Sequence, residues 1–250
     1  MSRGVFRILE ILRRATFDQL SRIIISLKLR YYPTLDIIRP YGKRHRVAMI
    51  KYNDLTFITP ITYAIYQPMI CEPKTYFFFN KILKESETSF LDVGAAIGTY
   101  ALLAAKRKKY VVAMEPNLFA FLTLQINAHI NKLNIIALRL AAYNQRCMIK
   151  IDEDWVEAIP IDDIGETFDI IKIDVDGYEK EVVEGAMETL RQCKYVIIEE
   201  RSETFEHVHR ILKKVGKKPI FYEKLYVESF SGSLLRPRVK PRDFNVVYSD

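Results

Sequence analysis

Three apolar stretches of this chain each end in small or acidic residues: residues 89–93 are followed by Gly94 and Gly98, residues 110–114 by Glu115, and residues 168–173 by Asp174 and Asp176. Glycines at a strand-to-helix turn let a ligand approach the backbone, and carboxylates bind hydroxyl groups or accept their protons. Ligands of open α/β sheets bind outside the carboxyl ends of the strands. The spacing therefore predicts one ligand site at which acids serve both binding and proton transfer.

The first stretch predicts a strand, a turn with the pattern Gly94-x-Ala96-x-Gly98, and a helix over residues 99–106. A dinucleotide enzyme would carry G-x-G-x-x-G instead. Asp92 precedes the first glycine by two residues and would lie poorly beside a pyrophosphate, whereas it suits a ligand with an ammonium group and a sulfonium. The pattern indicates S-adenosylmethionine. The alternative is a plain strand–turn–helix whose glycines serve packing.

Glu115 ends the second apolar stretch, 21 residues after Gly94. A carboxylate about 20 residues after the glycine turn is placed to accept hydrogen bonds from both ribose hydroxyls. The alternative, an acid solvated or ion-paired at a strand end, is the weaker interpretation once the glycine turn precedes it.

The third stretch is typical of a central parallel strand, and Asp174 and Asp176 follow it directly. A calcium loop is not supported, because the twelve-residue ligand pattern is missing and a strand precedes it where a helix should stand. A helix is expected over residues 178–191. Asp176 and Glu179 could alternatively serve only as the cap and first turn of that helix.

These motifs together resemble the FkbM family of class I S-adenosylmethionine-dependent methyltransferases. The resemblance spans about residues 70 to 215 and rests on Leu91-Asp-Val-Gly-Ala-Ala-Ile-Gly98, Glu115-Pro116, residues 124–131, Lys172-Ile-Asp-Val-Asp-Gly-Tyr-Glu179 and residues 182–190. Such enzymes typically methylate hydroxyl oxygens of small molecules and glycans. The resemblance implies an α/β, Rossmann-like, doubly wound sheet of seven mostly parallel strands, with one antiparallel strand and helices on both faces.

The resemblance also implies where the cofactor lies, with the chain at residues 141–143 flanking the adenine. We expect cofactor contacts at Asp92, Gly94, Ala96, Gly98, Glu115, Pro116 and Ala142. The chain departs from the family pattern in two segments. The family usually has Asn where this chain has Ala96, and Glu-Gly-Ala where it has Asp176-Gly177-Tyr178. The first departure removes a polar contact, and the second alters the mouth of the substrate site.

The expected reaction is in-line attack of a substrate oxygen on the sulfonium methyl group, for which the enzyme supplies alignment and exclusion of water. A neutral hydroxyl is a poor nucleophile, so a base should take its proton. Asp174 is the first candidate and Asp176 the second. A divalent ion such as magnesium, held by neighbouring acids, is the alternative activator, although the sequence predicts no dedicated metal site. The acceptor is expected to be a hydroxylated small molecule, a glycan or a lipid-linked substrate.

Positive charge is concentrated at the beginning of the chain. The first 50 residues carry 11 Lys and Arg against 3 Asp and Glu, so the remaining 200 residues of this +7 protein have a net charge of −1. Apolar residues between Phe6 and Leu27 recur near helical spacing, which predicts basic amphipathic helices. We expect an extension of helices and short strands over residues 1–70, before a methyltransferase domain over residues 71–250.

Three roles fit the basic segment. It packs as a lid on the domain, it contacts an anionic membrane surface through residues 1–46, or it grips RNA. The last role leaves open an RNA ribose methyltransferase, and a non-catalytic binding module of the same fold is a further alternative. Cys71, Cys147 and Cys193 are odd in number and far apart, which predicts no disulfide framework and a cytoplasmic location, peripheral at a membrane if the segment binds one. No transmembrane or secretory segment is evident, and the sequence does not address the oligomeric state.

Overall fold

The computed structural model describes residues 35–38, 44–52, 54–60, 72–85, 89–224 and 243–250. The chain divides into two compact units, Met1–Cys71 with Tyr226–Lys240, and Glu72–Leu225 with Pro241–Asp250. The predicted amphipathic helices and Cys71 lie outside the described residues, and the boundary at residue 70 stays a prediction. No helix of the described part of the chain is both long and apolar enough to cross a membrane.

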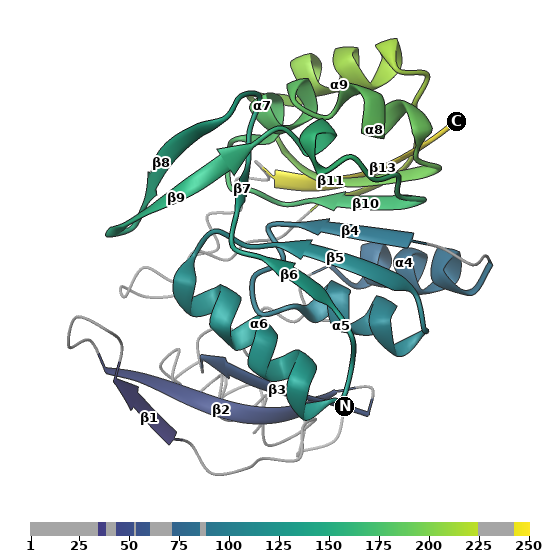
Figure 1. Cartoon of the computed structure of the whole chain (residues 1–250). Coiled ribbons are helices and arrows are strands. Elements are labelled where there is room, and N and C mark those ends of the chain that lie inside the picture. Colours follow the sequence, from purple (N-terminus) through teal and green to yellow (C-terminus); the bar gives the residue numbers. More distant parts are fainter. Residues whose placement is uncertain (1–34, 39–43, 53, 61–71, 86–88, 225–242) are drawn as a thin grey trace, which may run out of the picture. The chain divides into compact units, whose positions relative to one another are not determined.

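The first unit contains a three-stranded antiparallel sheet in the order β1-β2-β3 (Figure 1). Its strands are β1 (Leu35–Ile38), β2 (Arg44–Tyr52) and β3 (Leu55–Pro60). Ile50, Leu55 and Phe57 are buried. These strands belong to the predicted extension.

The second unit is built on a seven-stranded sheet in the order β12-β13-β11-β10-β4-β5-β6. The strands are β4 (Ser89–Val93), β5 (Tyr110–Met114), β6 (Ile136–Leu138), β10 (Ile170–Ile173), β11 (Tyr195–Arg201), β12 (Lys218–Lys224) and β13 (Asp243–Ser249). Strands β6, β5, β4, β10 and β11 pair in parallel, and β13 is antiparallel to both β11 and β12. The predicted seven-stranded, mostly parallel Rossmann-like sheet is confirmed.

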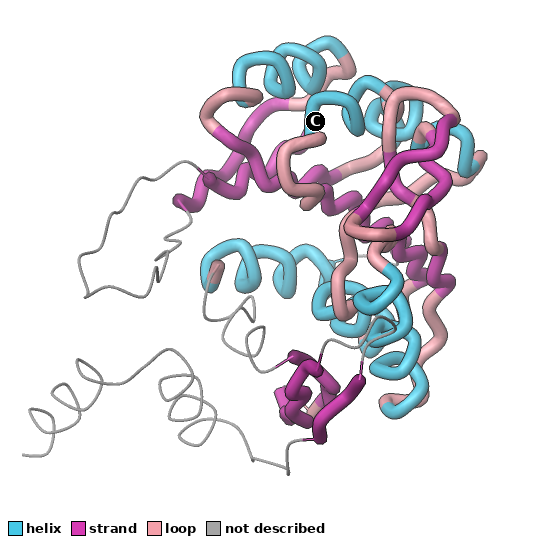
Figure 2. Tube along the Cα trace, turned by 90° about the vertical axis from the view of Figure 1, so that its left-hand side faces the viewer, coloured by secondary structure: helices cyan, strands magenta, loops and turns pink. Residues whose placement is uncertain are grey.

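Helices cover both faces of this sheet (Figure 2). They are α4 (Pro73–Glu85), α5 (Thr99–Lys106), α6 (Leu118–Ile130), α7 (Glu179–Glu184), α8 (Met187–Gln192) and α9 (Phe205–Lys214). Side chains alternate between the faces along each strand. Leu91 and Val93 therefore join the core under α7–α9, whereas Phe90 faces the other way and contacts Phe79 of α4, with ring centroids 5.0 Å apart.

The helix predicted over residues 178–191 is wrong in extent, because two short helices occupy this span and Gly185 separates them. A Cβ at Gly185 would lie 2.1 Å from the carbonyl oxygen of Tyr143. The carbonyl oxygen of Gly185 also accepts a hydrogen bond from the N–H of Asp162 at 3.0 Å. Close packing of another part of the chain against Gly185 therefore interrupts the helix.

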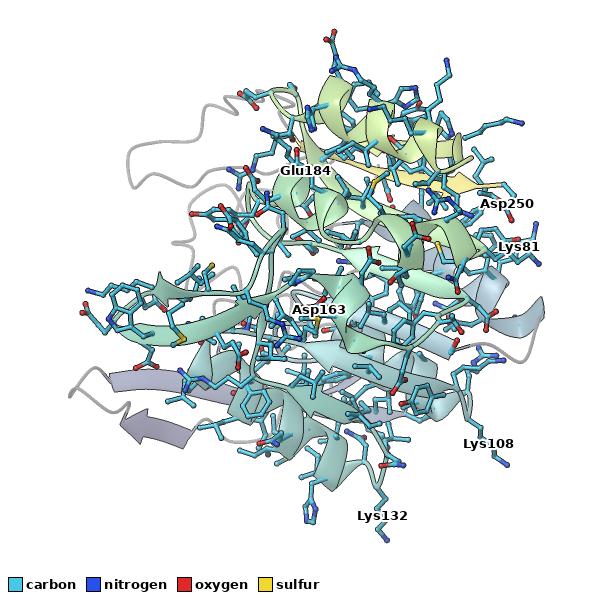
Figure 3. The ribbon with its side chains drawn as sticks, turned by 45° about the horizontal axis from the view of Figure 1, so that its top comes forward. Lys81, Lys108, Lys132, Asp163, Glu184 and Asp250 are labelled. Atoms are coloured by element: carbon cyan, nitrogen blue, oxygen red, sulfur yellow. The ribbon has the colours of Figure 1, made fainter. Side chains whose placement is uncertain are left out.

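A small sheet follows β6 and is built from β7 (Ala141–Ala142), β8 (Cys147–Ile151) and β9 (Asp154–Ile159). Strands β8 and β9 form the antiparallel hairpin at the left of Figure 1. Arg146, next to this hairpin, forms an ion pair of 2.6 Å with Asp163, in the 3₁₀ turn η2 (Ile161–Ile164); Figure 3 labels Asp163. The pair joins the hairpin to the chain that leads toward β10.

Candidate active site

The glycine turn between β4 and α5 is shaped by close backbone packing. The N–H groups of Gly94 and Ala95 both donate to the carbonyl oxygen of Met114, at 2.9 and 3.0 Å. Gly94 has φ +78°, and a Cβ there would lie 1.8 Å from the carbonyl oxygen of Asp174. Gly94 is thus required where β4, β5 and β10 end side by side. This contact brings the first and third sequence motifs together.

Gly98 is held in place by packing, and its contact with a cofactor stays a prediction. It caps α5 with φ +88°, and a Cβ there would lie 2.7 Å from Leu102 and 3.0 Å from Leu124. Between the two glycines, Ala96 also has a positive φ, +49°. This left-handed conformation is unfavourable for alanine and is tolerated better by asparagine. The departure at Ala96 therefore leaves a strained turn as well as one fewer polar group.

Asp92 is 2 % exposed, and its Oδ2 accepts the N–H of Ala101 at 3.0 Å. This bond satisfies a free N–H in the first turn of α5. Burial raises the pKa of Asp92 to about 6, although nearby Lys172 opposes the shift. The structure thus shows Asp92 organising the helix that follows the turn, and its contact with a cofactor stays a prediction.

Glu115 lies at the carboxyl end of β5 and connects two loops. Its Oε2 accepts the N–H of Ala96 at 2.7 Å, and its Oε1 accepts the N–H of Asn117 at 2.8 Å. The residue is 7 % exposed, and burial raises its pKa to about 7. Each oxygen keeps a second lone pair, so two hydroxyl groups of one ligand can still bind.

Pro116 is half-buried and follows Glu115 directly. Ala142 is 8 % exposed, and the neighbouring Tyr143 donates its N–H to the carbonyl oxygen of Ile159 at 2.9 Å. Glu184 of α7, labelled in Figure 3, accepts a hydrogen bond from Asn144 Nδ2 at 3.0 Å. The chain predicted to flank the adenine is therefore anchored to α7, while ligand contact at Pro116 and Ala142 stays a prediction.

The two candidate bases differ in their surroundings. Asp174 forms an ion pair with Lys172, with Nζ and Oδ2 2.6 Å apart, and its side chain is 31 % exposed. Asp176 has φ +53°, its side chain is 95 % exposed, and its nearest cation, Arg201, is 3.4 Å away. An acid in solvent can neither exclude water nor hold a substrate rigidly. The structure favours Asp174 over Asp176.

Glu179 begins α7 and is 1 % exposed. Its Oε1 accepts the N–H of Gly177 at 2.8 Å, and its Oε2 is buried without a hydrogen-bond partner. Burial raises its pKa. The bond to Gly177 agrees with the alternative in which Glu179 serves the first turn of the helix.

A group of charged residues that no sequence motif predicted surrounds Asp174. We call it the Lys172 cluster: Glu72, Asp92, Lys172, Asp174 and Glu199. Glu72 accepts a hydrogen bond from Asn245 Nδ2. Burial raises the pKa of Glu72 to about 7 and that of Glu199 to about 9, and the charge of Asp174 adds to both shifts. The sequence carries one signal for this cluster, because several of its charged residues stand next to apolar strand residues. Burying a charge is costly unless it is paired with another charge.

No three His, Cys, Asp or Glu side chains within the described ranges are grouped so that they could hold a metal ion. Cys147 and Cys193 are free thiols. The rings of Tyr143 and Tyr178 pack edge to face with centroids 6.3 Å apart, and Tyr178 is 54 % exposed. The bulky residue noted at position 178 thus contacts the segment expected to flank the adenine.

Residues 150–219 match the family model of the methyltransferase FkbM domain. The resemblance to the FkbM family is confirmed. The match includes β10, α7, α8 and β11, and with them Asp174 and its ion pair. No curated protein matches this chain.

Solved methyltransferases share the fold. The tRNA (uracil-54, C5)-methyltransferase of Pyrococcus abyssi, solved with S-adenosyl-L-homocysteine, has a TM-score of 0.51 and 16 % identity, covering 83 % of this chain and 46 % of that one. Trm5b of the same organism has a TM-score of 0.50 and 14 % identity, covering 93 % and 68 %. A methyltransferase FkbM from Methylobacillus flagellatus has a TM-score of 0.49 and 18 % identity, covering 76 % and 54 %. The chain thus spans about half the length of the first and third structures.

Proposed function

We propose that this FkbM-like chain is an S-adenosylmethionine-dependent methyltransferase that acts on a hydroxyl oxygen of a small molecule, a glycan or a lipid-linked substrate. The observation that carries the proposal is the meeting of the three motifs at the carboxyl edge of the sheet. Gly94 packs against the carbonyl oxygen of Asp174, while Glu115 holds the turn through Ala96. The carboxylate proposed to bind the cofactor and the carboxylate proposed to accept the proton thus lie at the ends of two strands, on either side of one glycine turn.

The donor set fits this cofactor. A ribose offers two neighbouring hydroxyl groups, and Glu115 presents two oxygens that are already oriented by backbone N–H groups. We assign Glu115 to the ribose, residues 94–98 to the methionine part, and Pro116 with Ala142 to the adenine. S-adenosylmethionine supplies an electrophilic methyl group when bound. The sulfonium of this cofactor is positively charged, and the neighbouring carboxylates of Asp92 and Asp174 are compatible with that charge.

Asp174 is assigned as the base that takes the proton of the acceptor hydroxyl. Its Oδ2 is held by Lys172, so Oδ1 is the oxygen available to an acceptor. A positioned base contributes roughly 10²- to 10⁴-fold to a reaction rate. The ammonium of Lys172 already provides a positive charge beside Asp174, so we favour the direct base over a magnesium-assisted mechanism.

The acids in and next to the Lys172 cluster affect which kind of acceptor can reach the site. Asp174 and Asp176 are the exposed acids of this region, with side chains that are 31 % and 95 % exposed. A phosphate backbone entering this region would meet charges of its own sign, which is unfavourable. We therefore favour an acceptor that is uncharged next to the reacting oxygen over RNA. Contact of residues 1–46 with an anionic membrane is a separate proposal.

Calorimetric titration with S-adenosylmethionine and S-adenosylhomocysteine, with NAD as the control, tests the cofactor. Micromolar binding of the first two and none of NAD is expected. Transfer of a labelled methyl group to hydroxylated glycosides, lipid-linked sugars and RNA, with and without magnesium, tests the acceptor. Failure to bind either sulfur compound would refute the proposed function, and methylation of RNA alone would replace the acceptor class.

A further inference from the structure

Lys172 occupies an unusual place for a charged residue. It lies in the central strand β10 between the fully buried Ile171 and Ile173 and is itself 2 % exposed. It pairs in register with Asp92 of β4 on one side and Ile197 of β11 on the other. A buried ion pair is commonly no more stabilising than apolar residues of similar volume. Stability of the sheet alone therefore gives little reason for a lysine here.

Lys172 contacts the candidate base and an aromatic ring of α5. Nζ lies 2.6 Å from Asp174 Oδ2 and 4.8 Å from the centroid of the Tyr100 ring. The side chain of Lys172 is 3 % exposed and that of Asp174 is 31 % exposed. The pair thus has one member anchored in the core and the other directed toward the surface.

The acids packed around Lys172 come from several elements. Asp92 is on β4, Asp174 follows β10, Glu199 is on β11, and Glu72 precedes α4 next to the Tyr100 hydroxyl of α5. Burial alone would lower the pKa of Lys172, but the charges of Asp174, Glu72 and Asp92 outweigh it and raise the pKa. Lys172 therefore stays an ammonium across the range in which an enzyme works.

We infer that Lys172 is a positioning residue for Asp174: it holds one carboxylate oxygen in the core and turns the other toward the acceptor hydroxyl. This inference rests on the proposed function for the role of Asp174. Asp174 follows the strand by one residue, and the backbone restrains it through the bond from its N–H to the carbonyl oxygen of Val93 at 3.0 Å. Lys172 restrains the side chain. The two contacts together leave the carboxylate little freedom to rotate.

The test compares two buried lysines that each contact a carboxylate. Lys172→Met removes the contact to Asp174. Lys217→Met is the matched control, because Lys217 is 1 % exposed and donates to Asp250 and to the carbonyl oxygen of Cys193, away from the site. Lys172→Arg restores a charged donor. Binding of S-adenosylhomocysteine by each variant reports whether the cofactor site is intact.

The first readout is carbon-13 NMR of labelled aspartate, in which the Asp174 carboxyl signal is assigned by its loss in Asp174→Asn. Lys172→Met should change the chemical shift of that signal at a fixed pH, because the carboxylate loses its ion-pair partner, and Lys217→Met should leave it unchanged. The second readout is methyl transfer to whichever hydroxylated glycoside the wild type methylates. Lys172→Met should lower kcat by about 100-fold or more, with a smaller change in KM, and Lys172→Arg should recover part of it.

An unchanged Asp174 signal in Lys172→Met would overturn the inference, and so would equal losses of kcat in the two methionine variants. If Lys172→Met does not fold, Lys172→Gln keeps a polar side chain without the charge, and a change in the same Asp174 signal is expected. Absence of S-adenosylhomocysteine binding by the wild type would refute the proposed function instead. The NMR comparison shows whether Lys172 acts on the Asp174 carboxylate, whether or not the protein binds the cofactor.

Discussion

Gly94→Ala tests the contact that joins the glycine turn to Asp174. The φ of +78° costs an alanine about 1–2 kcal/mol. The added Cβ would lie 1.8 Å from the carbonyl oxygen of Asp174, and that oxygen belongs to the backbone and cannot rotate away. Overpacking of this kind costs roughly 1–3 kcal/mol. We expect a total near 3 kcal/mol, which lowers the Tm of a domain of this size by about 6–12 °C.

Gly165→Ala is the matched control. Gly165 has φ +71°, and a Cβ there would meet nothing within 4 Å. It therefore incurs the backbone strain without the clash, about 1–2 kcal/mol. Thermal unfolding and urea denaturation of both variants measure the difference, and titration with S-adenosylhomocysteine should show lost affinity in Gly94→Ala only.

Equal destabilisation of the two variants would refute the reasoning. It would mean that Gly94 does not pack against the end of β10, and the convergence of the first and third motifs would lose its support. A Gly94→Ala protein that is markedly less stable but still binds the cofactor with wild-type affinity would separate packing from binding at the turn.

Three further predictions concern Glu115 and Ala96. Glu115→Ala should weaken S-adenosylhomocysteine binding by roughly 100-fold or more, since two hydrogen bonds to a charged group are lost; calorimetry checks this, and unchanged affinity would exclude the ribose assignment. Ala96→Asn should raise the free energy of unfolding by about 0.5–1 kcal/mol by relieving the positive φ of 49°, and a lower urea midpoint would count against it. The pKa of Glu115 is raised to about 7, above its ordinary value of 4.5, so its stabilising effect is full below about pH 4.5 and is lost as the pH rises through 7. Glu115→Gln should therefore reduce the loss of stability between pH 5 and pH 8, as followed by urea denaturation at each pH, and an unaltered pH dependence would contradict this.

Local patterns in the sequence were enough to predict the class of fold and the strands and turn on which the candidate site stands. An apolar strand followed by a glycine turn is a local signal, and the spacing from Gly94 to Glu115 spans a single strand–helix–strand unit. The predicted strand at residues 110–114 is found at these bounds. The helix expected over residues 99–106 is also confirmed. Such elements depend on residues close together in the chain.

Tertiary structure decided which acidic side chains are exposed and which are buried beside another charged group. The sequence could not show that the Asp176 side chain is exposed, because exposure depends on whether other parts of the chain pack against it. Nor could it show the break at Gly185, which depends on the close approach of Tyr143. The break at Gly185 thus arises from a contact between segments that are distant in sequence.

The Lys172 cluster illustrates the same limit. Its members range from Glu72 to Glu199, and Asn245 adds a hydrogen bond from β13. Each acid alone is an ordinary surface residue in the sequence. The register of β4, β10 and β11 places Asp92 beside Lys172 and puts the carboxyl ends of these strands at one edge. The sequence by itself determined that a glycine turn and a carboxylate would meet there, whereas the pairing of non-adjacent strands decided that a buried lysine would hold the candidate base.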